Sequence, residues 1–232
     1  MPQKPIAIVA ALETELAPLV KRWSTHLINT GGRMVRVYES DDAAAVAGGI
    51  GAEAAAAASQ LILEIYKPNI LISCGLAGAT TALHKVGEAF RAGEVIDSTT
   101  GKRWSGEGGK GILVSSPKVA NAGEKKQLAE LFSADAVDME AASVAGVAEG
   151  NGIRFMAVKA ISDAPEFAMP AIERFIDTEG RFSQRRFVQF LLLRPTLWPA
   201  TVRLAQNTRR ATKALACLMS DLIGSQQLTK AR

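Results

Sequence analysis

The sequence is poor in the residues that build metal centres and disulfide frameworks. Among 232 residues there are two cysteines and two histidines, and no Cys/His cluster has the spacing of a metal site, so we expect no bound metal. Cys74 and Cys217 lie far apart inside apolar patterns, which predicts two reduced core residues rather than a disulfide. No serine occupies a G-x-S-x-G turn, which together with the scarcity of histidine argues against a Ser-His-Asp triad.

Long hydrophobic runs are also missing. The longest late apolar run, residues 187–193, is far shorter than the roughly 20 residues that cross a bilayer. The N-terminus leads directly into a short strand-like stretch without a long apolar region or cleavage site, so a signal peptide is not expected. These features predict a soluble, cytoplasmic protein.

Acidic residues are absent from one long stretch near the C-terminus. The net charge is +4, but residues 181–220 contain no Asp or Glu. A basic stretch of this kind can face nucleic acid, an anionic membrane surface or water. Its basic residues are Arg181, Arg185, Arg186, Arg194, Arg203, Arg209, Arg210 and Lys213.

Short apolar runs alternate with helical patterns along the first 165 residues. Alternating strands and helices favour an α/β fold with a mostly parallel sheet covered on both faces. Strands are predicted at 5–11, 34–38, 43–47, 69–74, 86–96 (a pair broken by Gly93), 112–115 and 155–161. Helices are predicted at 13–23, 52–66, 124–132 and 140–149.

The strand signal stops after residue 170. Helical patterns cover 170–177, 184–193 and 196–223, with Pro195 and Pro199 as breaks. There is no internal repeat and no low-complexity linker. Length and composition therefore predict a single domain over 1–232, in which 171–232 is a helical, basic C-terminal extension.

Two glycine motifs follow predicted strands. They are Gly48-Gly-Ile-Gly51 and Gly75-Leu-Ala-Gly78. Glycine at such a position lets a ligand approach the backbone and leaves N–H groups free to bind oxygens. Tight packing of a strand against a helix explains either motif equally well, and neither matches the dinucleotide fingerprint or the P-loop.

Carboxylates stand where the apolar runs end. Glu13 and Glu15 follow the first strand, Glu140 precedes a helical pattern, and Asp163 ends the run 155–161. In α/β folds the crevice outside the strand ends is where ligands bind. The alternative is structural, because acids stabilise the first turn of a helix and Asp163 can be an ordinary N-cap.

In combination these motifs resemble the nucleoside phosphorylase superfamily, and most closely its methylthioadenosine/S-adenosylhomocysteine nucleosidase branch. The matching segments occur in the family's order and spacing at 6–15, 49–51, 67–78, 86–88, 136–142 and 158–163. The resemblance implies a three-layer phosphorylase-type α/β fold, with a central mixed, partly barrel-like sheet surrounded by helices. It also implies cleavage of the N-glycosidic bond of an adenosine-type purine nucleoside.

The resemblance assigns roles to eleven residues. Asp163 matches the general acid at purine N7, and Glu15 matches the acid that positions or deprotonates the attacking water. Glu140 matches the carboxylate that binds the ribose hydroxyls, with Met139 against the sugar, and both would stabilise a cationic C1′. Ser162 would hold Asp163 in place. The other implied pocket residues are Ile50, Leu76, Ala77, Gly78, Lys118 and Val119.

The sequence departs from the nucleosidase pattern in two places. Leu76 replaces a usual serine and removes a hydroxyl near the nucleophile. Residues 115–119 replace the usual base-binding stretch, so base recognition near Lys118 and Val119 is a hypothesis. The phosphate loop of purine nucleoside phosphorylases is absent, which favours water over phosphate as co-substrate and predicts no cofactor. A phosphate site could still come from Arg33, Arg36 or Arg91.

The C-terminal extension resembles that of the hopanoid-biosynthesis-associated phosphorylases of the same superfamily. That resemblance implies removal of adenine from adenosylhopane, and a basic face interleaved with apolar residues suits peripheral contact with an anionic membrane. The alternative is that the apolar residues pack on the core and the arginines are solvated. The family also implies a homo-oligomer, most simply a dimer, without a nucleic-acid partner.

A function from another class also remains open. The same pocket could sense a nucleoside without turnover, and the basic tail could bind a membrane or nucleic acid. Leu76 and the altered base loop motivate this alternative.

Overall fold

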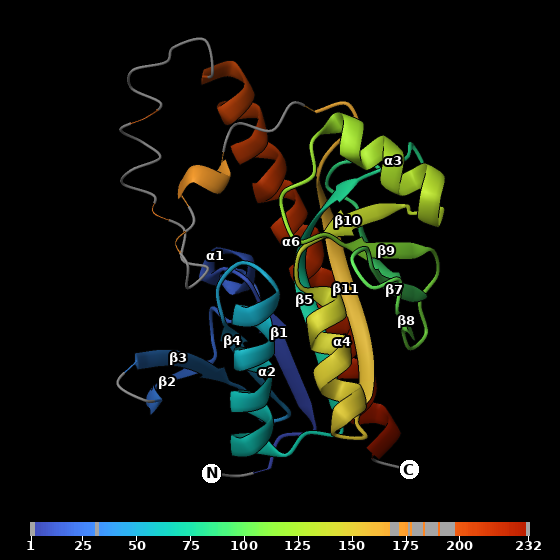
Figure 1. The fold of residues 1–232 in the computed structure, drawn as a ribbon. Coiled ribbons are helices and arrows are strands. Elements are labelled where there is room, and N and C mark those ends of the chain that lie inside the picture. The colour runs from blue at the N-terminus through green and yellow to red at the C-terminus, as the bar shows by residue number, and fades with distance from the viewer. Residues whose placement is uncertain are drawn as a thin grey trace.

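The computed structural model describes residues 3–30, 33–167, 172–175, 177, 183, 190 and 198–230. They form one mixed sheet of eleven strands with helices on its faces (Figure 1). The elements are β1 (Ile6–Ala10), α1 (Glu13–Leu16), β2 (Ser24–Thr30), β3 (Arg33–Glu39), β4 (Ala43–Ala47), α2 (Ala52–Tyr66), β5 (Ile70–Ala79), β6 (Ala89–Ala92), β7 (Glu94–Asp97), β8 (Arg103–Ser105), β9 (Ile112–Ser115), α3 (Ala122–Phe132), β10 (Ala136–Asp138), α4 (Ala141–Gly150), β11 (Arg154–Asp163), the 3₁₀ turn η1 (Ile172–Phe175) and α6 (Trp198–Lys230).

The strand β5 is the branch point of the sheet. It pairs in parallel with β1 and β11, and its last residues pair antiparallel with β10. On the other side of β1 the order continues through β4, β3 and β2. Every residue of β1 is buried, as expected for a parallel strand covered on both faces.

The strands beyond β5 follow a nearly closed ring, in which β6 and β7 are joined through the chain and not by pairing, so the sheet is partly barrel-like as predicted. β11 pairs with β6, and β7 pairs with β9, which pairs with β10 and so returns to β5. Only Gly93 separates β6 from β7. A Cβ there would lie 3.1 Å from the Gly109 carbonyl oxygen, so glycine permits the close passage at this corner.

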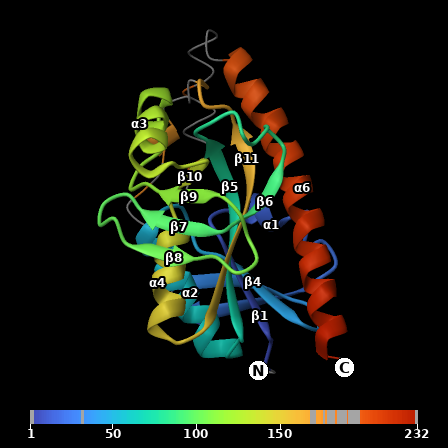
Figure 2. The ribbon, with the colours of Figure 1, turned by 90° about the vertical axis from the view of Figure 1, so that its right-hand side faces the viewer.

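Helices cover both faces of the sheet. α2 and α4 lie side by side on one face (Figure 1), and α6 runs along β11, β5 and β6 on the other (Figure 2). The middle of α6 buries Ala211, Leu215 and Met219 in a core shared with Ile72 and Val158. None of the helices in the described ranges has the length and apolar character needed to cross a bilayer.

Several predicted elements have other bounds in the structure. α1 ends at Leu16 instead of residue 23, because Pro18 lacks the N–H that would continue the helix, and residues 24–30 form a strand. Strands at 103–105 and 136–138 were not predicted. Pro199 does not break the last helix, since it lies in the first turn of α6, where proline is tolerated. The predicted helix at 184–193 falls almost wholly outside the described residues.

Two local predictions about glycine and cysteine are also wrong. The motif Gly75-Leu-Ala-Gly78 does not follow a strand as predicted, because it lies inside β5, which continues to Ala79. Cys74 is buried as expected, but Cys217 is exposed on α6 rather than part of the core.

Candidate functional site

A cleft of about 170 Å³ opens where the carboxyl ends of β1, β5, β10 and β11 meet. All eleven residues selected from the sequence line this cleft. They are Glu15, Ile50, Leu76, Ala77, Gly78, Lys118, Val119, Met139, Glu140, Ser162 and Asp163. The sequence analysis did not select the other lining residues, which are Ala11, Leu12, Ala120, Lys125, Val137 and Asp138.

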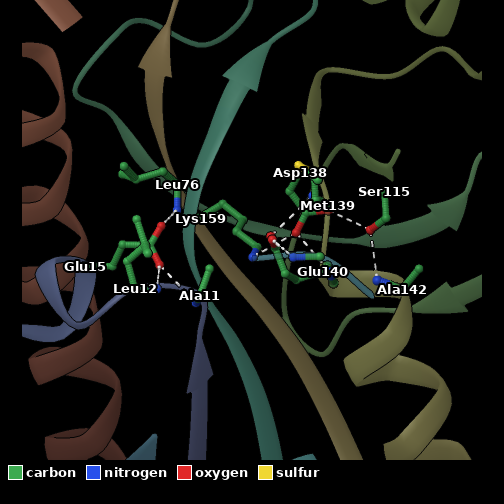
Figure 3. A network of polar contacts seen from close by, with 12 residues as sticks. Ala11, Leu12, Glu15, Leu76, Ser115, Asp138, Met139, Glu140, Ala142 and Lys159 are labelled. Carbon is green, nitrogen blue, oxygen red and sulfur yellow. Dashed lines mark hydrogen bonds and ion pairs between the residues drawn. The ribbon is translucent and has the colours of Figure 1, made fainter. Parts of the chain in front are cut away.

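The Glu15 carboxylate is fixed by three backbone N–H donors (Figure 3). Its Oε2 accepts from Ala11 and Leu12, each at 3.0 Å, and its Oε1 accepts from Leu76 at 3.1 Å. A Cβ on Gly75 would lie 3.2 Å from both oxygens, so this glycine leaves room for the carboxylate. Leu76 thus contributes its backbone N–H to the site, and not the hydroxyl of the serine that is usual in the nucleosidase pattern.

Opposing influences act on the proton affinity of Glu15. Burial raises its pKa above the usual range, and the hydrogen bond from Leu12 and the nearby Lys159 ammonium act in the lowering direction. A carboxylate with a raised pKa takes a proton from water more readily than an exposed one. Glu15 is therefore a fixed, buried carboxylate suited to act as a general base.

A buried lysine, Lys159 of β11, lies between Glu15 and the Asp138–Glu140 group in the polar network behind the cleft (Figure 3). Its Nζ lies 2.8 Å from Asp138 Oδ2, and the two side chains are 2% and 0% exposed. Burial alone would lower the pKa of this ammonium, but the carboxylates of Asp138, Glu140 and Glu15 outweigh burial and raise it. The signal in the sequence was one charged residue inside the apolar run 155–161, because a buried lysine requires a carboxylate partner.

Asp138 is a structural member of this network as well as a lining residue. Its carboxylate accepts hydrogen bonds from Ser115 Oγ at 2.6 Å and from the backbone N–H of Ala141 at 2.9 Å. These bonds tie β9 and the first turn of α4 to β10. They also set the position of the adjacent Met139 and Glu140.

The Glu140 carboxylate closes the other side of the network. Its Oε1 accepts from the backbone N–H of Gly51 at 2.8 Å, at the N-terminal end of α2. Gly51 has a φ of 97°, a conformation that favours glycine, and its N–H binds an oxygen as expected for this motif, here that of a carboxylate. Burial, followed by the charge of Asp138, raises the pKa of Glu140 to about 7 against the opposing Lys159.

Asp163 ends β11 and is not the helix cap considered from sequence. Its Oδ1 accepts from Ser162 Oγ at 2.6 Å, so Ser162 holds the carboxylate as expected. Its Oδ2 is ion-paired with Lys125 of α3, and both side chains are 2% exposed. Lys125 lies in the charged run Glu124-Lys-Lys126, which gave no signal that one of the lysines is buried.

The residues considered for base binding line the cleft, whereas two arginines considered for phosphate binding do not. Lys118 and Val119 line the cleft, and Lys118 is ion-paired with Glu124 of α3. Arg36 is instead paired with Glu13 at 2.7 Å, outside the lining set, and Arg91 does not line the cleft either. Within the described ranges, no three His, Cys, Asp or Glu side chains converge as a metal site would require.

The family model and the sequence relatives that this chain matches agree with one another. A family model described as the phosphorylase superfamily matches residues 5–120 and 108–187. The chain is 26% identical over 196 residues to the 5′-methylthioadenosine/S-adenosylhomocysteine nucleosidase of Actinobacillus succinogenes, covering 68% of this chain and 85% of that protein. It is 26% identical over 198 residues to the nucleosidase of the same name from Buchnera aphidicola, covering 69% and 85%.

Comparison with solved structures supports the same fold. The methylthioadenosine nucleosidase of Helicobacter pylori, in a mutant crystallised with 5′-methylthioadenosine in its active site, superposes with a TM-score of 0.73 at 16% identity. That match covers 97% of this chain and all of the other. The futalosine hydrolase of Helicobacter pylori superposes with a TM-score of 0.73 at 16% identity, covering 96% and 98%. At this identity the likeness concerns the fold alone.

Proposed function

Because the chain belongs to the phosphorylase superfamily, we propose that it hydrolyses the N-glycosidic bond of an adenosine-type purine nucleoside and releases the base. One observation carries the proposal: Glu15, Glu140 and Asp163 come from three separate parts of the chain and line one cleft. The nucleosidase names of the sequence relatives support the same reaction class.

In the proposed reaction the three carboxyl groups act on different atoms. A proton delivered at N7 by Asp163 makes the purine a viable leaving group, a contribution of about 10²–10⁴-fold. As the C1′–N9 electron pair moves to the base, positive charge grows on C1′. Glu140 and the polarizable sulfur of Met139 lie in the same cleft and stabilise that charge better than they stabilise the neutral substrate. Glu15 takes the proton of the attacking water.

Water is favoured over phosphate as the nucleophile by the charges of the cleft. Each described lysine that lines it is paired with a carboxylate, Lys118 with Glu124 and Lys125 with Asp163. No arginine is among the described lining residues. A phosphate dianion would also meet the buried Glu15, and like charges at close range are costly in a site of low dielectric. The same Glu15 suits a neutral water.

The test is release of adenine from 5′-methylthioadenosine, S-adenosylhomocysteine and adenosylhopane, measured by chromatography with and without phosphate. Inosine, followed by release of hypoxanthine, is included because a futalosine hydrolase shares the fold. We expect phosphate-independent turnover of at least one substrate and a loss of about 10²–10⁴-fold in Asp163→Asn. The exposed Asp41→Asn variant is the matched control. Strict phosphate dependence, or full activity of Asp163→Asn, would contradict the proposal.

A membrane-bound substrate is a second possibility that one surface favours. Trp198 and Val202 are 48% and 54% exposed at the start of α6. The exposed Arg209 and Lys213 follow at helical spacing on the same side of α6. Such a strip suits contact with an anionic bilayer, where an adenosylhopane would reside. Salt-sensitive sedimentation with phosphatidylserine vesicles, reduced in Trp198→Ala and Arg209→Ala, would support it, and equal sedimentation of all forms would not.

The homodimer implied by the family also stays a prediction. Size-exclusion chromatography with light scattering measures it directly, and a monomeric mass at micromolar concentration would contradict it.

A further inference from the structure

The helix α3 has an unusual inward face. Lys125 is its one buried residue, although a buried helix position is ordinarily apolar. A lysine is almost never fully buried unless it is paired. Its ammonium is ion-paired with Asp163 Oδ2 and donates to the Ala164 carbonyl oxygen at 2.8 Å. α3 is thus anchored to the end of β11 through a charge.

Glycine at position 78 leaves room for the pair of Lys125 and Asp163. A Cβ on Gly78 would lie 2.9 Å from Lys125 Cε and 3.0 Å from Asp163 Oδ2, so a side chain at position 78 would crowd both members of the pair. Replacing a buried ion pair with apolar residues is often neutral or stabilising, so stability alone does not explain a lysine here. The lysine also lines the cleft.

One hydrogen of the ammonium remains available. A lysine ammonium has three N–H donors, and in the part of the chain that the structure describes Lys125 has two acceptors, Asp163 and Ala164. Asp163 Oδ1 is occupied by Ser162 and Oδ2 by Lys125. The pair therefore offers the cleft a donor and a carboxylate together.

We propose that Lys125 is the resident source of the proton that reaches N7 of the purine, and that Asp163 is positioned by it and relays that proton. This inference rests on the proposed function. As ammonium and carboxylate, or as amine and carboxylic acid, the pair is neutral overall and contains one transferable proton. An isolated carboxylate would instead turn a negative charge towards the N7 lone pair and have nothing to give it.

The step balances in protons and electrons. A proton moves from Lys125 to Asp163 and from Asp163 to N7, while the C1′–N9 electron pair passes to N9. The base leaves as a neutral molecule protonated at N7, and Lys125 is left as an amine. Water then adds to C1′, and its proton passes to Glu15. Solvent returns that proton to Lys125, so the net consumption is one water.

The other described charged groups that line the cleft are already engaged. Lys118 precedes α3 and is paired with Glu124 of the same helix. Across the cleft, Asp138 is paired with Lys159, near Glu140 and Glu15. Lys126, the next residue of α3, is exposed and 3.9 Å from Glu130. This makes Lys126→Met a matched control for Lys125→Met, with the same chemical change on the same helix.

The experiment compares kcat and KM across pH for the wild-type enzyme, Lys125→Met, Lys125→Arg and Lys126→Met, on whichever nucleoside the wild type cleaves. At neutral pH we expect kcat of Lys125→Met to fall about 10²–10⁴-fold with little change in KM. The loss should shrink at acidic pH, where solvent more readily supplies the proton that N7 receives. Lys125→Arg should recover part of the rate, and Lys126→Met should match the wild type.

A purely structural role gives other results. It predicts an equal loss at every pH, or a loss that follows the fraction of folded protein measured by circular dichroism. Either result, or an unchanged kcat in Lys125→Met, would overturn the proposal. The double variant Lys125→Met/Asp163→Asn should be no slower than the slower single variant if both residues serve one proton transfer, and multiplicative losses would also contradict it.

A binding measurement separates this inference from the proposed function. The wild-type protein should bind adenine more tightly than 7-deazaadenine, which lacks the N7 acceptor, and Lys125→Met should lose that preference at neutral pH. If no nucleoside is cleaved but the preference follows Lys125, the hydrolase proposal fails and the donor role stands. If nucleosides are cleaved and the preference is unaffected by Lys125→Met, the donor role fails alone.

Discussion

Removing the ammonium of Lys159 should destabilise the protein strongly and in a pH-dependent way. The variant Lys159→Met keeps the length of the side chain but leaves Asp138 buried without its cation, 2.8 Å from where the ammonium stood. It also removes the charge that opposes the raised pKa values of Glu15 and Glu140. Three carboxyl groups then share one poorly solvated region, where like charges disfavour ionisation.

The magnitude follows from the burial of the pair. Breaking a buried ion pair by removing one partner costs about 3–5 kcal/mol, out of a typical total of about 5–15 kcal/mol. Asp138 keeps its hydrogen bonds from Ser115 and Ala141, which favours the lower end, about 3 kcal/mol. The loss should be smaller at acidic pH, since the orphaned carboxylates can take up protons and become neutral.

The assay is urea denaturation of wild-type and variant proteins at several pH values. The control is Lys102→Met, which breaks an ion pair of 2.6 Å to Glu149 whose side chains are 52% and 53% exposed. That surface pair should contribute at most about 1 kcal/mol. Adding Asp138→Asn to Lys159→Met should recover part of the lost free energy of unfolding. If Lys159→Met costs no more than Lys102→Met, the central role given to the buried pair is wrong.

A glycine of the cleft, the Glu140 carboxylate and the two cysteines each provide one more test of the structure. Gly78→Ala should lower turnover, because its Cβ would press on Lys125 Cε and Asp163 Oδ2, whereas Gly146→Ala, whose added Cβ meets nothing closer than 3.8 Å, should not; normal turnover of Gly78→Ala would contradict this. Because folding raises the pKa of Glu140 from 4.5 to about 7, its favourable contribution is complete below pH 4.5 and is lost as pH rises through about 7, so Glu140→Gln should flatten that part of the stability profile by at most roughly 3 kcal/mol. Maleimide should label Cys217 rapidly and Cys74 only on unfolding, because Cys74 is buried and burial raises its pKa to about 12; labelling of both at equal rates would refute the placement of Cys74.

The fold and the cleft could largely be predicted from local pattern. The apolar runs at β1, β4, β9 and β11 are nearly continuous, so their burial on both faces could be read without knowing their neighbours. Less regular strands were missed, since β8 and β10 have three residues each and take their conformation from pairing. α1 was predicted too long because its apolar spacing continued past Pro18.

The functional residues of the cleft could likewise be predicted only in part. The acids at the ends of apolar runs were visible because Glu15, Glu140 and Asp163 stand where strands or helices begin and end. Their cationic partners were not. Lys159 is a single charge in an apolar strand, and Lys125 is one of two adjacent lysines on a short helix. Which of these two faces inward depends on how α3 packs against β9.

The sequence by itself determined the family, most of the strands and helices, and three of the four acids that line the cleft, because these follow from patterns local in the chain. Tertiary structure alone decided which polar and charged groups pair with one another. Lys125 and Asp163 are 38 positions apart, Ser115 and Asp138 are 23 apart, and Gly51 and Glu140 are 89 apart. Burial makes those pairings strong, since a charge removed from water is stabilised only by the partner that the fold places beside it.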